Sequence, residues 1–146
     1  MAGLLVLFIL ISSPQEVIVA GPLQPVLSCV QAVLIAQGEK LWRVDQENST
    51  IITAFRLVNP SALRQIAIIH RAAAEIRWLK GRYQLTITLS QAERDGTRVR
   101  AVARILGYGE SALPLMRPSP WIPLPSTGTL EGDALAAIIA ACPPTP

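Results

Sequence analysis

The sequence predicts an α+β domain in which an antiparallel sheet of two hairpins is packed on one face by helices. Two pairs of stretches rich in β-branched residues flank turn residues, and three other stretches repeat apolar residues at helical spacing. The expected order is helix, hairpin, helix, hairpin, connector and helix. A chain of 146 residues, 51% of them hydrophobic, is long enough to bury one core.

The first helix is expected to run from Pro25 to Gly38, because glycine readily adopts the left-handed conformation that ends a helix. Its apolar residues recur at i, i+4, i+7 and i+8, namely Val26, Val30, Val33 and Leu34. The strands of the first hairpin are expected at Leu41–Val44 and Ile51–Val58. Between them, residues 45–48 have the composition of a turn.

The second helix is expected to begin at Pro60 and to end near Gly81. Its apolar stripe consists of Leu63, Ile66, Ala67, His70, Ala73 and Ala74. His70 is the single histidine of the chain, and no Cys or Asp lies at the spacing that would orient a general base. We therefore interpret His70 as a core or flanking residue rather than a catalytic one.

The second hairpin shows the clearest alternation in the chain, around the turn dipeptide Asp95-Gly96. The inward residues are expected to be Tyr83, Leu85, Ile87, Leu89, Val99, Ala101, Ala103 and Ile105. The residues of the opposite face that we propose for partner binding are Arg98, Arg100, Arg104, Thr86 and Thr88. Thr and Arg also suit the solvated side of any antiparallel strand, so simple solvation is the alternative.

A connector rich in proline and glycine is expected over residues 107–125, because its prolines disfavour helix and central strand. Trp121 is expected to anchor this connector against the core. The last helix is expected to open at Ser126–Thr129. Glu131 and Asp133 would then lie near its positive end, in contact with solvent.

The composition of the N-terminal stretch predicts a targeting segment rather than part of the folded domain. Residues 4–11 form an apolar run long enough for a secretory signal and too short to span a bilayer. We expect residues 1–20 to be an export signal cleaved after Ala20 or a membrane anchor, and residues 21–146 to be the domain. A third alternative is lipidation of Cys29, since residues 26–29 are similar to a lipobox. The remaining alternative is that the N-terminal stretch is no targeting segment, but a buried apolar strand or the product of a mis-assigned start codon.

The two cysteines, Cys29 and Cys142, have no metal-ligand spacing. They could pair in an oxidising compartment, but we favour two unpaired, buried cysteines on helices. The formal net charge is +3, and aromatic residues make up 5% of the chain without clustering in sequence. This composition lacks the footprint of a nucleic-acid binder.

Motifs for catalysis are missing from the sequence. It holds no phosphate-binding glycine loop and no Gly-x-Ser-x-Gly nucleophile elbow. The carboxylate pairs Glu93/Asp95 and Glu131/Asp133 flank a turn and a helix start, where we expect both to be solvated. We therefore expect no enzyme, no metal and no cofactor.

Several short segments of the sequence resemble segments of small bacterial envelope lipoproteins. They are Gln37–Asp45 with Ser49–Thr53, Gly81–Ile87, Asp95–Val99 and Leu124–Glu131. Together they resemble the helix-on-sheet domains of the outer-membrane assembly lipoprotein C group over residues 25–141. The resemblance implies an accessory module of the cell envelope without catalytic residues.

These observations lead to three functional expectations. The first is an exported, periplasmic or membrane-attached protein that binds an envelope protein partner without catalysis. The second is a carrier of a small apolar ligand held between sheet and helices, where Ala101, Ala103, Ala134 and Ala137 would leave room. The third is an anchored small subunit of a membrane complex.

Overall fold

A computed structural model describes residues 15–70, 76–111 and 121–142 of the chain. The helices are α2 (Leu23–Ala36), α3 (Pro60–Ile66) and α4 (Thr129–Ala141). The strands are β1 (Gln15–Ala20), β2 (Leu41–Asp45), β3 (Thr50–Thr53), β4 (Arg56–Val58), β5 (Ile76–Gln91), β6 (Gly96–Ser111) and β7 (Trp121–Leu124). The predicted α+β class is confirmed, although the sheet has seven strands rather than the four of two hairpins.

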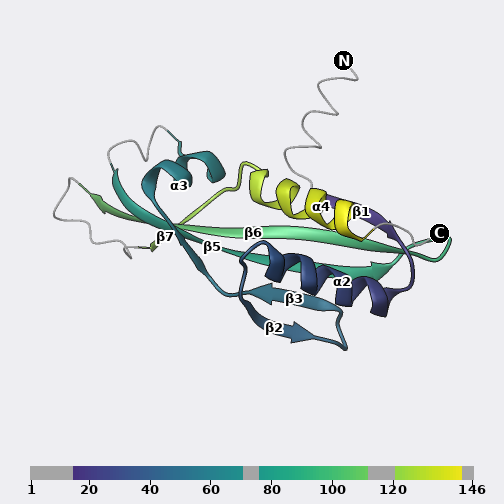
Figure 1. The fold of residues 1–146 in the computed structure, drawn as a ribbon. Helices are drawn as coiled ribbons and strands as arrows, with labels where there is room; N and C mark the ends of the chain where they lie inside the picture. Colours follow the sequence, from purple (N-terminus) through teal and green to yellow (C-terminus); the bar gives the residue numbers. More distant parts are fainter. Residues whose placement is uncertain (1–14, 71–75, 112–120, 143–146) are drawn as a thin grey trace, which may run out of the picture.

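The sheet is built around the long antiparallel hairpin of β5 and β6 (Figure 1). On the outer side of β6, β1 pairs with residues 96–101 and β7 pairs with residues 105–108. On the outer side of β5, β3 pairs with residues 86–88 and β4 pairs with residues 81–83, and β2 adds to β3. Short strands therefore share each edge of the central hairpin end to end.

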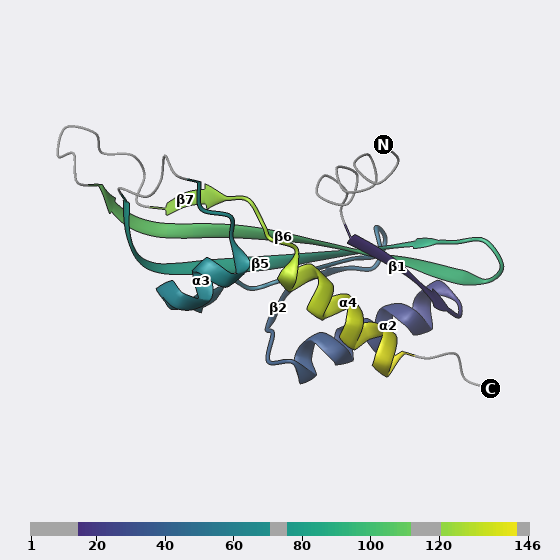
Figure 2. The same ribbon diagram turned by 90° about the horizontal axis from the view of Figure 1, so that it is seen from above.

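All three described helices lie on one side of the sheet (Figure 2). One buried cluster joins α2 and α4 to the sheet and includes Leu34, Ile87 and Ile138. A second cluster joins α3 to the other end of the sheet around Leu63 and Trp78. The opposite face of the sheet carries none of the described helices.

The second predicted hairpin is confirmed and is longer than expected. Arg94 and Asp95 each have a φ of 59°, and the amide of Ala92 donates to the carbonyl of Gly96 at 2.8 Å, which closes the turn. The inward residues are buried, except for Ala103, which is half-buried. The five outward residues proposed for partner binding are exposed or half-buried, so the two-residue period sets the two faces correctly for them.

The prediction of a second helix reaching Gly81 is wrong. Helix α3 ends at Ile66, because Ala67 forms a bridge with Ser126 and the amide of Ile68 donates to the carbonyl of Pro125 at 2.8 Å. His70 lies beyond the helix and is exposed, and Ala73 and Ala74 fall outside the described residues. Strand β5 has begun by Ile76, so Gly81 is a strand residue.

Gly81 has a packing role in β5. A Cβ atom at this position would lie 2.6 Å from Cδ1 of Leu63. The missing side chain therefore lets α3 sit close to the sheet.

The connector predicted over residues 107–125 is shorter than expected. Strand β6 continues to Ser111, and β7 pairs with it along Ile105–Tyr108. Pro123 is tolerated in β7 because this strand pairs with β6 alone among the described strands, and an edge strand does not need every amide. Residues 112–120 lie outside the described residues.

The first predicted hairpin is confirmed as β2 and β3. The second strand expected at Ile51–Val58 is interrupted after Thr53, however, and resumes as β4 at Arg56. The amide of Ala54 donates to the carbonyl of Lys40 at 2.7 Å at this interruption. Phe55, in the gap, lies close to the cations of the helix-free face, as described below.

Residues 15–20, which the sequence placed in an export segment, form β1. This strand pairs with β6 along its whole length, and Val19 is only 4% exposed. The apolar run over residues 4–11 lies outside the described residues. No helix of the described ranges is long and apolar enough to cross a membrane.

Cys29 and Cys142 form a disulfide with a Cα–Cα distance of 6.1 Å, so the favoured reading of two unpaired thiols is wrong. The bond joins the middle of α2 to the C-terminal end of α4.

Glu131 also differs from expectation, because it is only 9% exposed and accepts a hydrogen bond from the hydroxyl of Ser126 at 2.8 Å. That bond ties the carboxylate to the segment before α4.

Candidate functional site

The helix-free face of the β5–β6 hairpin is cationic. The outward cations of the rows Lys80–Ser90 and Arg98–Tyr108 are Lys80, Arg82, Arg98, Arg100 and Arg104. The other outward residues of these rows are Gln84, Thr86, Thr88, Ser90, Val102, Leu106 and Tyr108, so the rows contain no carboxylate. Complementary charge must therefore come from neighbouring strands or from outside the molecule.

Three cations and three aromatic rings alternate at one end of this face, and we call them the cation–aromatic ladder. Its members are Tyr108, Lys80, Trp121, Arg82, Phe55 and Arg104. Lys80 Nζ lies 4.9 Å from the ring centroid of Tyr108 and 5.6 Å from that of Trp121. Each ring attracts a cation through the negative potential of its face.

Arg82 lies in the middle of the ladder. Its guanidinium carbon is 4.2 Å from the ring centroid of Trp121 and 4.5 Å from that of Phe55. The guanidinium carbon of Arg104 lies 5.9 Å from the ring centroid of Phe55. Tyr108 and Trp121 meet with their ring centroids 5.2 Å apart and an interplanar angle of 67°, an edge-to-face contact.

The ladder covers apolar surface and leaves one donor without a partner. Leu106 is 5% exposed although it faces away from the helices, and Arg82 and Pro123 are its neighbours across the strands. Nε of Arg82 is buried and has no hydrogen-bond partner among the described residues. A buried donor left in this way costs free energy that a bound acceptor would recover.

The five residues proposed from the sequence all lie on this face. Arg100 lies opposite Thr88, and Thr86 lies opposite Val102. Nε of Arg98 is 3.7 Å from a carboxylate oxygen of Glu16 on β1, and both side chains are about half exposed. Such a surface ion pair is worth about 0–1 kcal/mol. Arg104 belongs to the ladder, as described above.

The sequence did not identify Lys80, Arg82, Phe55, Tyr108 or Trp121 as members of the site. Lys80 and Arg82 continue the period-two pattern of Gln84 and Thr86, but the predicted helix ending near Gly81 hid that continuation. The expectation that Trp121 anchors against the core is wrong, because its ring lies on the helix-free face against Arg82.

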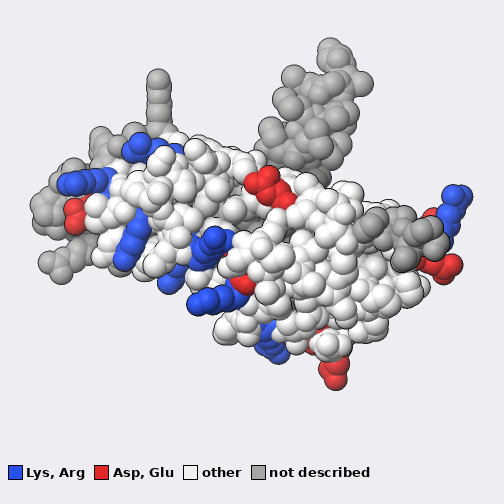
Figure 3. All heavy atoms as spheres, in the orientation of Figure 1, with Lys and Arg blue, Asp and Glu red and all other residues white. Residues whose placement is uncertain are grey.

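The ladder cations have no ion-pair partner among the described residues, whose two ion pairs are Arg56–Glu39 and Arg98–Glu16. The surface over α2 and α4 differs from this face. Neither α2 nor α4 contains a Lys or Arg, and the surface over these two helices is nearly free of positive charge (Figure 3). Basic side chains are thus concentrated away from α2 and α4.

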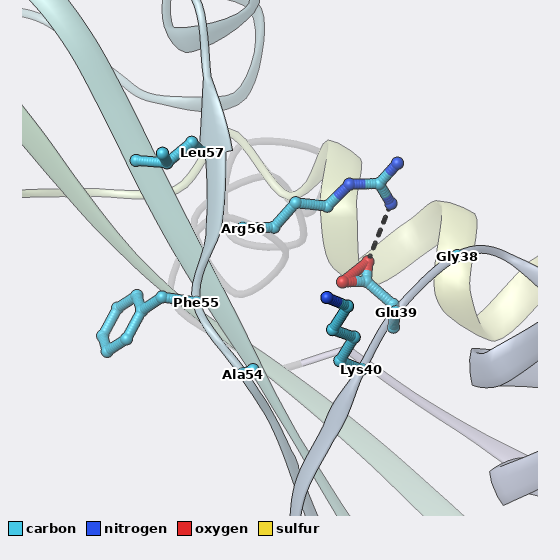
Figure 4. Close-up of a pocket in the computed structure, with 7 residues that line it drawn as sticks. All are labelled: Gly38, Glu39, Lys40, Ala54, Phe55, Arg56 and Leu57. Atoms are coloured by element: carbon cyan, nitrogen blue, oxygen red, sulfur yellow. Dashed lines mark hydrogen bonds and ion pairs between the residues drawn. The ribbon is translucent and has the colours of Figure 1, made fainter.

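A pocket of about 320 Å³ borders the ladder where β2 begins and β3 passes into β4. It is lined by Gly38, Glu39, Lys40, Ala54, Phe55, Arg56 and Leu57. Phe55 and Leu57 point to one side of their strand, and Arg56 points to the other, toward Glu39 (Figure 4). The pocket and the ladder therefore have Phe55 in common.

Glu39 organises the inner wall of this pocket. It is 7% exposed and accepts from the hydroxyl of Tyr83 at 2.8 Å and from Nη1 of Arg56 at 3.4 Å. Burial, with the hydrogen bond to the nearby carboxylate, raises the pKa of Tyr83 to about 12. The neutral tyrosine thus acts as a donor that holds the carboxylate in place.

An apolar groove of about 420 Å³ lies on the helix-covered side, between α2 and α4. Its lining residues are Cys29, Ala32, Val33, Ala36, Gln37, Ala137 and Ala141. The sequence predicted room for a ligand between sheet and helices, beside the small alanine side chains. Ala101 and Ala134 are fully or nearly fully buried in the two core clusters, so their small side chains let helices and sheet pack closely.

Cys29, proposed from the sequence for lipidation, lies within α2 with its sulfur in the disulfide to Cys142. A sulfur in a disulfide cannot also carry a thioether-linked lipid, so the two states are alternatives. Within the described ranges, no group of three or more His, Cys, Asp or Glu side chains is placed to hold a metal ion.

No protein-family model and no curated protein matches the chain.

Proposed function

We propose that the protein is an exported interaction module of the cell envelope that binds a partner protein on its helix-free sheet face. The observation that carries the proposal is the set of five outward cations on β5 and β6, which ends in the cation–aromatic ladder; the carboxylates Glu16 and Asp45 on the same face belong to β1 and β2. Arginine and large aromatic residues are enriched in the parts of protein interfaces that contribute most to binding.

Exposed apolar side chains on the same face support docking. Ile18 is 62% exposed, Leu57 is 68% exposed and Val102 is 47% exposed. Cross-strand pairing places all three on the helix-free side, since they lie opposite Arg98, Arg82 and Thr86 respectively. A partner that covered the face would bury them together with the hydrocarbon stems of the arginines.

The disulfide between Cys29 and Cys142 supports export. Disulfides form and persist in oxidising compartments such as the periplasm, and they are rare where thioredoxin and glutathione keep thiols reduced. The resemblance of the sequence to envelope lipoproteins agrees with this location.

The position of β1 bears on where an export signal would end. Cleavage after Ala20 would remove a strand that contributes Val19 to the core. We propose that any cleavage occurs before Gln15, so that β1 stays in the mature protein. N-terminal sequencing of the mature protein tests this: a first residue at or before Gln15 is expected, and a first residue at Gly21 would refute the placement.

Charge reversal tests the docking function. The triple variant Arg98→Glu/Arg100→Glu/Arg104→Glu is tested against the wild type by recovering the partner from the envelope fraction. We expect the amount of partner recovered with the variant to be at least about tenfold lower. The matched control is Arg64→Glu, an exposed arginine on α3. Partner recovery that is unchanged in the triple variant, with the fold intact by circular dichroism, would refute docking on this face.

A carrier is the second candidate function, favoured by the apolar groove between α2 and α4. An apolar ligand there would lie on the outer side of the helices rather than between helices and sheet. Native mass spectrometry of the purified protein is the test. A co-purified apolar molecule lost in Ala32→Glu would support the carrier, and bare protein alone would count against it.

A further inference from the structure

We infer that the helix-free face takes an extended acidic segment of the partner protein, with Arg82 binding one of its carboxylates. This inference rests on the docking function proposed above and adds the chemistry of the partner. It follows from the charge of the face, from the way the ladder holds Arg82, and from the length of the cationic row.

The charge of the face selects a negatively charged occupant. Five cations and no carboxylate lie in the outward rows Lys80–Ser90 and Arg98–Tyr108, while the carboxylates Glu16, Asp45 and Glu110 lie on the same face outside these rows. A second copy of this chain, docked through the same face, would place like charges against one another, which is unfavourable. An acidic segment supplies the missing counter-charges instead.

The ladder prepares Arg82 for a planar anion. Rings of Trp121 and Phe55 lie 4.2 and 4.5 Å from its guanidinium carbon, so little side-chain freedom remains to be lost on binding. Stacked rings contact the faces of a guanidinium and leave its N–H edge as the binding surface. A carboxylate approaching that edge can accept two parallel hydrogen bonds, one of them from the buried, unpartnered Nε after a small shift of the side chain.

The arrangement of the row favours a polypeptide over a membrane surface. From Lys80 to Ser90 the outward row spans ten residue steps, or about 33 Å, which matches an extended segment of about ten residues. The exposed apolar residues Ile18, Leu57 and Val102 are separated from one another by cations. A surface that inserts into lipid would gather its apolar residues into one patch.

Fluorescence anisotropy with synthetic peptides tests the inference on the oxidised full-length protein. The probe is a labelled peptide of about ten residues in which Asp and Glu alternate with apolar residues. Its matched control has Asn and Gln at the acidic positions. We expect the acidic peptide to bind at least about tenfold more tightly than the amide control, and its affinity to fall as salt rises.

Variants then locate the carboxylate site. Arg82→Ala is expected to weaken binding of the acidic peptide about tenfold, and Arg82→Lys to recover only part of the loss because lysine lacks the planar fork. Arg100→Ala, which removes an exposed cation outside the ladder, should weaken binding less, and Arg64→Ala on α3 not at all. Equal loss in Arg82→Ala and Arg64→Ala would overturn the assignment of Arg82.

The inference and the docking proposal can fail separately. Equal affinity for the acidic peptide and its amide control, or no binding of either, would overturn the inference that the face takes an acidic segment. If the variant Arg98→Glu/Arg100→Glu/Arg104→Glu nevertheless loses the cellular partner, the proposal of docking on this face would still stand. Stronger binding to vesicles of phosphatidylcholine and phosphatidylglycerol than to the peptide would also overturn the inference, in favour of a lipid surface.

Discussion

The guanidinium carbon of Arg82 lies 4.2 Å from the ring centroid of Trp121, although β5 and β7 do not pair with each other. The two side chains meet across β6, which pairs with both strands. The contact therefore depends on the registers of two separate ladders of hydrogen bonds. The contact links β7 to the central strand β5, on the face of the sheet away from the helices.

Removing the ring of Trp121 should destabilise the fold. Trp121→Ala loses contacts with Lys80 and Arg82 and part of the cover over Leu106, so we expect the free energy of unfolding to fall by about 1–3 kcal/mol. Urea denaturation measures this change. Trp42→Ala is the matched control because Trp42 is 66% exposed, and it should change stability by no more than about 0.5 kcal/mol. Equal losses in the two variants would contradict the ladder.

Alkaline pH should weaken the fold through Tyr83. Burial raises the pKa of Tyr83 to about 12, above the ordinary value of 10.0 that it would have in the unfolded chain. Its stabilising contribution is therefore fully present below pH 10 and is lost as the pH rises to about 12. Measurements of the free energy of unfolding between pH 9 and 12 should show this loss in the wild type, beyond any decline in Tyr83→Phe.

Two variants separate the causes of this pH dependence. Tyr83→Phe removes the shorter of the two hydrogen bonds to the buried carboxylate of Glu39 and leaves the 3.4 Å bond from Nη1 of Arg56, so stability at neutral pH should fall by about 1–3 kcal/mol. Glu39→Gln removes the negative charge next to Tyr83, so the folded-state pKa of Tyr83 should lie closer to its ordinary value and the loss of stability above pH 10 should be smaller and end at a lower pH. A decline with the same shape in all three proteins would contradict the role of Tyr83.

The disulfide should be a major source of stability. It joins residues separated by 113 positions, so it restricts much of the unfolded chain. We expect Cys29→Ala/Cys142→Ala to lower the free energy of unfolding by about 2–4 kcal/mol, measured with urea. Mass spectrometry after alkylation should find neither thiol free in the protein taken from its native compartment. Two alkylated thiols there would contradict both the bond and the proposed oxidising location.

Gly107 should not tolerate a side chain. A Cβ atom at this position would collide with the indole ring of Trp78, which is buried on the helix-covered face. We expect Gly107→Ala to cost about 1–3 kcal/mol by urea denaturation, because the ring is rigid and has nowhere to move. In Gly132→Ala the nearest atom is Oε1 of Gln15 at 3.1 Å, on a flexible side chain, so we expect a change below about 1 kcal/mol.

Local patterns predicted the parts of the fold that local forces decide. The alternation in β5 and β6 identified the inward face, and the helical spacing from Val26 to Leu34 identified α2. The second helix failed beyond Ile66 for a reason that lies elsewhere in the chain. The backbone there bonds to Pro125, Ser126 and Thr127, and these partners cannot be found from the spacing of nearby apolar residues.

The candidate site was only partly visible in the sequence for the same reason. Arg98, Arg100 and Arg104 follow from the alternation of one strand. The ladder instead needs Phe55, Arg82 and Trp121 to be brought together by three strand pairings. The disulfide likewise joins two helices far apart in sequence, and no spacing rule connects Cys29 to Cys142.

Site-specific photo-cross-linking in cells that express the chain natively tests the central claim most directly. A photoreactive residue would replace Val102 on the helix-free face or, as the control, Ile139 on α4. These side chains are similarly exposed, at 47% and 51%. We predict a discrete adduct with a partner protein from position 102 and none from position 139. Adducts from position 139 alone, or equally from both positions, would contradict docking on the helix-free face.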